Sequence, residues 1–228
     1  MTDRLPPKIL LLGHRGARHA APENTIAAFD LALRHSAHGF EFDVRRTRDR
    51  QAVICHDPKF HRLTIRHNTL KQLRASCNSP KDLPPTLEAV LERYQNSAVL
   101  NIEIKVRGLE ELVARAVRRS RPRRYFISSF LPGVIRKLHA LDSSLVLGVL
   151  AQTRWQLRRW RTLPVKYIVP HYRLLSPRVI EKLHAADKIV ITWTVNRSSQ
   201  MLRAARWGVD GIISDDTRRL VETLGERT

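Results

Sequence analysis

Residues 38–57, HGFEFDVRRTRDRQAVICHD, begin with an apolar run that carries two acidic residues. Side chains alternate along a strand, so Glu41 and Asp43 share one face and Phe42 lies on the other. Two carboxylates on one face repel each other unless a proton or a cation lies between them. Because oxygen ligands suit Mg²⁺ and Ca²⁺, we predict that the pair binds a divalent cation. The alternative is a surface strand whose acids are solvated.

The second half of this stretch indicates a hairpin. A polar turn, TRDRQ, separates the first strand from a second apolar run at 51–55. The returning strand brings His56 and Asp57 back toward the end of the first one. Imidazole has an unperturbed pKa of about 6.5, so His56 is a candidate acid or base beside the two carboxylates.

Outside this hairpin, short apolar runs alternate with helical patterns. The first run, 8–13, precedes a helix whose N-cap we expect at Asn24, and the second strand is 39–45. Another helix covers 86–95. Further strands are predicted at 98–104, 124–128, 145–150, 166–169, 188–195 and 210–214, with helices near 108–120, 131–141, 153–161, 176–186, 198–207 and 216–225.

Eight strand–helix units in fewer than 250 residues favour one architecture. We predict the α/β class and a closed (β/α)₈ TIM barrel rather than an open doubly wound sheet. No Pro-, Gly- or Ser-rich linker divides the chain, so we expect one domain over residues 1–228. Residues 57–84 are expected to form a small insert after the second strand, too short for a core of its own.

The chain is strongly basic, with a formal net charge of +20 over 228 residues. Such a charge can favour nucleic acid, an anionic membrane or an anionic substrate. Arg154, Arg158 and Arg161 recur at helical spacing and would form a stripe that contacts a membrane, or simply a solvated helix face. No zinc spacing, RNP-like motif or basic–aromatic tract occurs, so we do not expect nucleic acid as a partner.

The apolar segments also bear on location. No run of 18 apolar residues occurs, and the apolar part of residues 1–16 is too short for a signal peptide. We therefore expect a cytoplasmic protein without a membrane span. The two cysteines do not form a CxxC pair and do not suggest a disulfide framework. The sequence leaves the oligomeric state open.

In a (β/α)₈ barrel, active sites lie at the C-terminal ends of the strands. Polar residues follow several of the predicted strands here. His14 and Arg15 end the first, and Glu103 and Lys105 end the third at a spacing that places both on one face. The seventh strand ends with Trp193 and Asn196, and the eighth ends with Ser214 and Asp215. Carboxylates, imidazoles and cations gathered in one mouth predict a metal site that handles an anion.

These residues also carry a resemblance to a known family. HRGAR, PENT, GFEFDVRRTRD, HD, LPPTLEAVL, NIEIK, ISSF, ITWTVN and GVDGIISD occur in this order across nearly the whole chain. The ordered set resembles the glycerophosphodiester phosphodiesterase family. The resemblance implies a TIM barrel that uses a divalent metal to cleave glycerophosphodiesters into glycerol 3-phosphate and an alcohol. Two departures, PKFHRLTIRH after HD and SDDT at 214–217, leave the preferred headgroup open.

The resemblance also implies roles, residue by residue. The metal would be one Mg²⁺ or Ca²⁺ ion, held by Glu41, Asp43 and Glu103. The catalysts would be an acid–base pair of histidines, His14 and His56. The phosphate would be bound by two cations, Arg15 and Lys105. Glu23 and Asp57 would support these groups from behind or border them. We expect Trp193 to form an apolar wall for the glycerol carbons.

The expected chemistry has one histidine deprotonate the nucleophile while the other protonates the departing alcohol. We assign His14 as the base and His56 as the acid. The nucleophile is either water or the glycerol 2-hydroxyl. Three alternatives compete with an enzyme that hydrolyses soluble glycerophosphodiesters. They are a lysophospholipase D-like enzyme at a membrane surface, a basic nucleic-acid-binding barrel, and a barrel that has lost activity.

Overall fold

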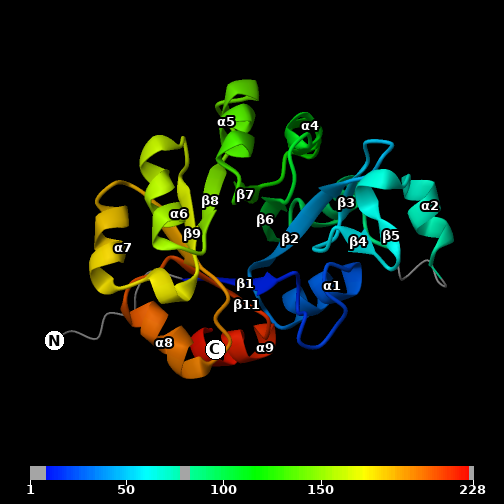
Figure 1. Ribbon diagram of the computed structural model, residues 1–228. Coiled ribbons are helices and arrows are strands. Elements are labelled where there is room, and N and C mark those ends of the chain that lie inside the picture. Colours follow the sequence, from blue (N-terminus) through cyan, green and yellow to red (C-terminus); the bar gives the residue numbers. More distant parts are fainter. Residues whose placement is uncertain (1–8, 78–82, 226–228) are drawn as a thin grey trace.

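The computed structural model describes residues 9–77 and 83–225. Eight parallel strands close into a barrel, because β1 pairs with both β2 and β11 (Figure 1). In order around the barrel they are β1 (Leu10–His14), β2 (Gly39–Arg46), β6 (Val99–Ile104), β7 (Arg124–Ser129), β8 (Leu147–Ala151), β9 (Tyr167–Pro170), β10 (Ile189–Thr192) and β11 (Gly211–Ser214). The predicted TIM-like α/β barrel is confirmed. Lys8 of the first predicted strand lies outside the described residues.

Helices surround the barrel, and one follows each of its strands. They are α1 (Ile26–Arg34), α3 (Leu87–Tyr94), α4 (Glu110–Ser120), α5 (Pro132–Leu141), α6 (Arg154–Arg158), α7 (Pro177–His184), α8 (Ser198–Arg206) and α9 (Thr217–Leu224). The helix expected over 153–161 is α-helical only in α6 and continues as the 3₁₀ helix η3 (Arg159–Thr162); a second, η4 (Tyr172–Leu174), follows β9. None of the helices in the described ranges is both long and apolar enough to cross a membrane.

Alternation along β2 separates two packed layers. Phe40 and Phe42 point outward, where Phe40 stacks on Phe29 of α1 at 4.2 Å and meets Tyr94 of α3 edge-on at 5.0 Å. The barrel interior is filled by a second cluster of buried apolar side chains: Leu12, Val99, Phe126, Leu150, Val169, Ile191 and Ile213. Farther toward the C-terminal ends of β2 and β6, the residues that face the barrel interior are polar. These polar side chains therefore lie at the C-terminal mouth of the barrel.

The predicted hairpin is present. β3 (Ala52–Ile54) pairs antiparallel with the end of β2, with Val44 opposite Ile54. The insert then forms a two-stranded sheet, β4 (Lys59–Phe60) and β5 (Leu63–Thr64), a 3₁₀ turn η1 (Ile65–His67) and a helix α2 (Leu70–Ala75). Residues 78–82 of the expected insert lie outside the described residues. Ile65 and Leu73 pack on Val53 of β3, so the insert shares the core of the hairpin.

The expected N-cap of α1 is wrong by one residue. Thr25 caps the helix, since its Oγ1 accepts from the backbone N–H of Ala28 at 3.2 Å. Asn24 instead has φ of +58°, a left-handed conformation that asparagine tolerates better than most residues. This turn directs the Asn24 side chain toward β2, where it contacts Asp43.

Candidate active site

Three carboxylates meet inside the barrel mouth. Asp43 of β2 lies opposite Glu103 of β6 in the parallel register, and Glu41 lies two residues earlier on the same face. One carboxylate oxygen from each residue lies within 4.8 Å of the corresponding oxygens of the other two. The three residues are 3%, 1% and 6% exposed in the order Glu41, Asp43 and Glu103. The shared face expected from alternation is therefore observed, and a solvated surface strand is excluded.

Two cations partly neutralise this cluster. Lys105 places Nζ 2.8 Å from Glu103 Oε1 and 3.2 Å from Asp43 Oδ1. Arg15 places Nε 3.2 Å from Asp43 Oδ2, and its backbone N–H donates to Glu41 Oε2 at 3.0 Å. Three ionised carboxylates facing two cations leave an excess negative charge at the mouth.

The pKa values of the three acids reflect this imbalance. Burial and the charges of Asp43 and Glu103 raise the pKa of Glu41 well above its usual value. Burial, with the charge of Asp43, raises the pKa of Glu103 to about 7 although Lys105 opposes the shift. Burial acts in the same direction on Asp43, but Lys105, Arg15 and a hydrogen bond from Asn24 outweigh it and lower the pKa of Asp43. The cluster thus favours an additional positive charge.

One carboxylate oxygen of the cluster is left without a hydrogen-bond partner in the part of the chain that the structure describes. Glu41 Oε1 is buried and has no hydrogen-bond donor among the described residues. A buried polar atom without a partner is costly unless an ion or a proton satisfies it. The donor set consists of carboxylate oxygens only, which suits a hard divalent cation. The residues therefore fit a metal site formed by Glu41, Asp43 and Glu103.

His14 lies beside the cluster and is oriented from its other side. Its Nδ1 is 2.6 Å from Asp215 Oδ1, and its Nε2 is 3.9 Å from Glu41 Oε2. Burial lowers the pKa of His14, against the opposing hydrogen bond to Asp215. A carboxylate can only accept, so we assign the proton of neutral His14 to Nδ1. Its Nε2 then carries a free lone pair toward the carboxylates.

His56 approaches the mouth from the end of the hairpin. Its Nδ1 lies 2.8 Å from Asp57 Oδ1, and its carbonyl accepts from Arg45 Nε at 2.7 Å. His56 also borders a cavity of about 190 Å³ that residues of the insert line, Phe60 among them. Charge on His56 contributes to the lowered pKa of Asp43, which places the imidazole within electrostatic reach of the cluster.

Of the remaining predicted residues, Glu23 is linked to the cluster through Arg15. Glu23 Oε1 is 2.8 Å from Arg15 Nη1, and its Oε2 is 3.2 Å from Arg18 Nη2, so Glu23 orients Arg15. Trp193, after β10, donates from Nε1 to the carbonyl of Val169 at 2.8 Å. This bond holds the indole at the end of the barrel, and Asp57 contacts His56 rather than the acidic cluster.

Three contributors received no such role from the sequence. Asn24 Nδ2 donates to Asp43 Oδ2 at 2.9 Å, and Asn196 Nδ2 donates to Asp215 Oδ2 at 2.6 Å. Asp215 in turn holds His14. All three belong to motifs quoted above, PENT, ITWTVN and GVDGIISD, so their position after a strand or in a motif was the available signal.

The chain is similar to proteins of one family over almost its full length. The profile of the Glycerophosphoryl diester phosphodiesterase family matches residues 14–219. The chain belongs to this family. A glycerophosphodiester phosphodiesterase of Caldanaerobacter subterraneus is 31% identical to it, over 95% of this chain and 98% of the relative. The chain is accordingly a glycerophosphodiester phosphodiesterase, a phosphoric diester hydrolase.

Solved structures of glycerophosphodiester phosphodiesterases and related enzymes share its fold. The enzyme of Thermotoga maritima superimposes with a TM-score of 0.80 at 25% identity, covering 95% of this chain and 98% of that one. A phosphodiesterase of Oleispira antarctica, solved with the product sn-glycerol-3-phosphate, gives a TM-score of 0.80 at 25% identity, covering 97% and 98%.

Proposed function

We propose that this glycerophosphodiester phosphodiesterase releases glycerol 3-phosphate and an alcohol from small soluble glycerophosphodiesters. The observation that carries the proposal is the buried cluster of Glu41, Asp43 and Glu103, with its unpartnered Glu41 oxygen beside His14. The product bound to the relative from Oleispira antarctica supports the choice of substrate. We propose Mg²⁺ or Ca²⁺ as the ion, since every ligand in the cluster is a carboxylate.

Arg15 and Lys105 bind the phosphate in this proposal. When bound, a divalent cation supplies positive charge to a non-bridging phosphate oxygen. Lys105 has three N–H donors, of which two face Asp43 and Glu103, so a third is available to the substrate. Arg15 is fixed by Glu23 and Asp43 at the rim of the cluster. Fixed cations of this kind need no reorganisation when charge develops on the phosphate.

His14 acts as the base and His56 as the acid in the proposed reaction. His14 Nε2 carries the lone pair that faces the cluster, and Asp215 stabilises the imidazolium formed when it accepts a proton. His56 lies on the hairpin end beside a cavity of about 190 Å³, a volume suited to a small alcohol group. Trp193 would border the glycerol carbons. The nucleophile is water or the glycerol 2-hydroxyl, which would give a cyclic phosphate first.

The test is release of glycerol 3-phosphate from glycerophosphocholine and glycerophosphoethanolamine, with chelator and with added Mg²⁺ or Ca²⁺. Activity that disappears in chelator and returns with one of the ions supports the proposal. Full turnover in chelator would contradict the metal, and absence of glycerol 3-phosphate would contradict the substrate class. Detection of cyclic glycerophosphate decides between the two nucleophiles.

One observation favours a second candidate, a lysophospholipase D-like activity at an anionic membrane. Trp155 of α6 is 67% exposed, and exposed Arg154 and Arg158 flank it. The guanidinium of Arg159 stacks on its ring at 4.1 Å. Tryptophan and basic residues are enriched where proteins contact the membrane interface. Release of lysophosphatidic acid from lysophosphatidylcholine, faster than turnover of glycerophosphocholine, would favour this candidate.

A further inference from the structure

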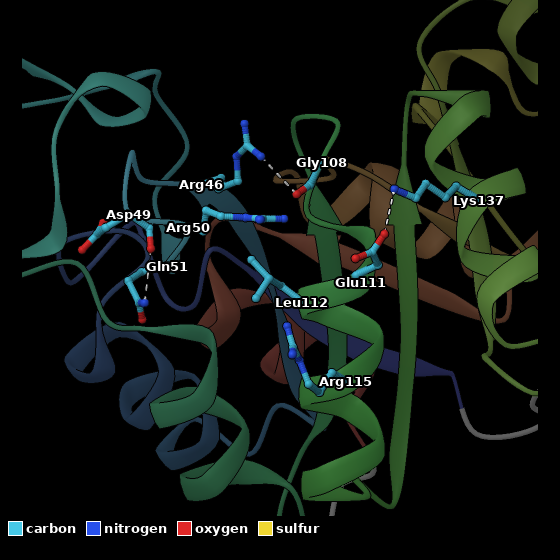
Figure 2. A pocket seen from close by; sticks show the side chains of 9 residues that line it. All are labelled: Arg46, Asp49, Arg50, Gln51, Gly108, Glu111, Leu112, Arg115 and Lys137. Carbon is cyan, nitrogen blue, oxygen red and sulfur yellow. Dashed lines mark hydrogen bonds and ion pairs between the residues drawn. The ribbon is translucent and has the colours of Figure 1, made fainter.

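A cavity of about 530 Å³ lies between the β2–β3 hairpin and helices α4 and α5 (Figure 2). Its charged lining, called the basic pocket here, consists of Arg46, Arg50, Arg115 and Lys137 together with Asp49 and Glu111. None of these six side chains has a part in the reaction proposed above. Four cations against two acids leave the basic pocket positively charged.

The basic pocket is separated from the acidic cluster by the barrel wall. Along β2, Asp43 points inward, whereas Phe42, Val44 and Arg46 share the opposite, outward face. A strand rises about 3.3 Å per residue, so Arg46 lies roughly 10 Å farther along β2 than Asp43 as well. A ligand in the basic pocket would therefore not occupy the substrate position.

Both acids of the basic pocket already have partners. Asp49 Oδ1 accepts from the Thr47 hydroxyl at 2.6 Å and from the Leu70 backbone N–H at 3.1 Å. Glu111 Oε1 lies 3.3 Å from Lys137 Nζ, an ion pair drawn in Figure 2. The ion pair neutralises Lys137, whereas the donors to Asp49 are uncharged and leave its negative charge in place. The three arginines opposite Asp49 therefore give the basic pocket its positive excess.

The three arginines reach the cavity from different elements. Within residues 9–77 and 83–225, Arg46, Arg50 and Arg115 form no ion pair with a carboxylate. Figure 2 shows Arg50 extending from the hairpin turn toward the loop before α4, and Arg115 rising from α4. The hairpin and the helix thus present guanidinium groups to one space.

Arg46 is held in place by the loop that it faces. Its Nη1 donates to the Gly108 carbonyl at 3.5 Å. Gly108 has φ of +84°, and a Cβ there would lie 2.9 Å from Arg46 Nη1, so this glycine makes room for the guanidinium. A guanidinium carries five N–H donors, and this single contact leaves most of them for a ligand.

We propose that the basic pocket binds a small soluble anion that carries one or more phosphate groups. Guanidinium forks match phosphate oxygens bidentately and are less hydrated than ammonium groups, which makes arginine clusters selective for phosphate. The cavity of about 530 Å³ exceeds what one inorganic phosphate needs and lies in the range of about 300–1,000 Å³ typical of small-ligand sites. Apart from Gly108 and Leu112, its lining residues are charged or carry an amide, which disfavours a wholly apolar ligand.

The test is titration calorimetry with inorganic pyrophosphate, in chelator, on the full chain. Arg50→Gln combined with Arg115→Gln removes two exposed charges from the basic pocket. Arg118→Gln combined with Arg119→Gln removes two exposed charges at the C-terminal end of α4, outside the basic pocket, and serves as the control. We expect the first double variant to lose pyrophosphate binding, or to raise its Kd at least about tenfold. The control should change this Kd less than about twofold.

A second measurement locates the binding site directly. Arg50 and Arg115 are modified with phenylglyoxal and quantified by mass spectrometry, and we expect pyrophosphate to protect both. Equal binding by both double variants, or no protection of these arginines, overturns the proposal. Binding seen only to vesicles that contain phosphatidic acid also overturns it, because the ligand would then be a lipid headgroup. Turnover of glycerophosphocholine should be the same in both double variants, which keeps this result independent of the proposed function.

Discussion

At the scale of single residues, Glu41 is the most informative position in the acidic cluster. It is buried, its pKa is raised by burial and by Asp43 and Glu103, and one of its oxygens has no donor among the described residues. These properties disfavour an ionised Glu41 unless a cation is close. We interpret the repulsion among the three buried carboxylates as the cost of a site that becomes stable when a divalent ion binds.

The first prediction is that Glu41→Gln lowers kcat/KM at least about a hundredfold, because a neutral amide is a poor ligand for a hard cation. Added Mg²⁺ or Ca²⁺ should restore little of the activity. The exposed Glu88→Gln on α3 is the control and should retain wild-type turnover. Steady-state release of glycerol 3-phosphate measures both, and a Glu41→Gln enzyme with normal turnover in chelator would exclude the metal site.

The second prediction separates the two histidines by the leaving group. The leaving group of a p-nitrophenyl ester departs as p-nitrophenolate without protonation, so loss of a general acid matters little for this aryl ester. We expect His56→Ala to recover much of its activity on glycerophospho-p-nitrophenol, and His14→Ala to stay impaired on both substrates. General acid–base catalysis contributes about 10²–10⁴-fold, which makes the contrast measurable. Equal losses on both substrates would indicate that the imidazoles bind phosphate instead.

The third prediction concerns Asp215, a positioning residue that acts through His14. Asp215→Asn should lower kcat about 10–100-fold with little change in KM, since it weakens the orientation of the imidazole. The neighbouring Asp216 is the control: its side chain accepts from the Arg219 N–H as the N-cap of α9. Asp216→Ala should cost about 1 kcal/mol of unfolding free energy and leave kcat nearly unchanged. The opposite pattern, with kcat lost only in the Asp216 variant, would refute the assignment.

At the scale of elements, α6 differs from the other barrel helices. It has only five residues, none of them buried, and it presents arginines and Trp155 on its surface. A helix this short contributes little to core packing. Its residues are therefore available to contact solvent or a partner surface. The stripe formed by Arg154, Arg158 and Arg161 is exposed, as the helical spacing predicted, although η3 rather than α6 carries its last member.

The fourth prediction follows from that stripe. Reversing Arg154, Arg158 and Arg161 to Glu should weaken binding to anionic vesicles, because each basic residue near such a surface contributes about 1 kcal/mol. Turnover of glycerophosphocholine should be spared. The control reverses three exposed arginines at and beyond the C-terminal end of α4: Arg118, Arg119 and Arg123. Vesicle co-sedimentation that does not distinguish the two triple variants would leave the stripe as a solvated helix face.

At the scale of the whole molecule, the barrel joins strands whose polar ends repel one another. Glu41, Asp43 and Glu103 come from adjacent strands β2 and β6, and closure between β1 and β11 completes the mouth. An ion bound there would cross-link the sheet through side chains. Its binding free energy would then contribute to the stability of the fold as a whole.

The fifth prediction is that Mg²⁺ or Ca²⁺ raises the melting temperature. A ligand at a hundred times its Kd adds about 2.7 kcal/mol, and 1 kcal/mol corresponds to about 2–4 °C in a domain of this size, so we expect a rise of about 5–10 °C. K⁺ at equal ionic strength is the control. Glu103→Gln should abolish most of the increment, and an equal rise in that variant would place the ion elsewhere.

Much of this protein follows from sequence alone, because the deciding signals are local. Alternation along 39–45 determines which side of β2 carries Glu41 and Asp43, and the repeated strand–helix pattern leaves few folds other than a closed barrel. The motif order identified the family that the comparison confirmed. The ends of helices and strands were predicted less accurately. The N-cap of α1 is Thr25 rather than Asn24, because Asn24 adopts a left-handed conformation and its side chain contacts Asp43 on the distant strand β2.

Only the tertiary structure decided which distant residues meet. His14 and Asp215 are 201 positions apart and pair because closure of the barrel places β1 beside β11. The basic pocket likewise needs the hairpin, α4 and α5 in their folded positions, and no local pattern connects Arg50 with Arg115. Periodicity records which face of its own element a residue occupies, whereas contacts between elements depend on how the whole chain packs.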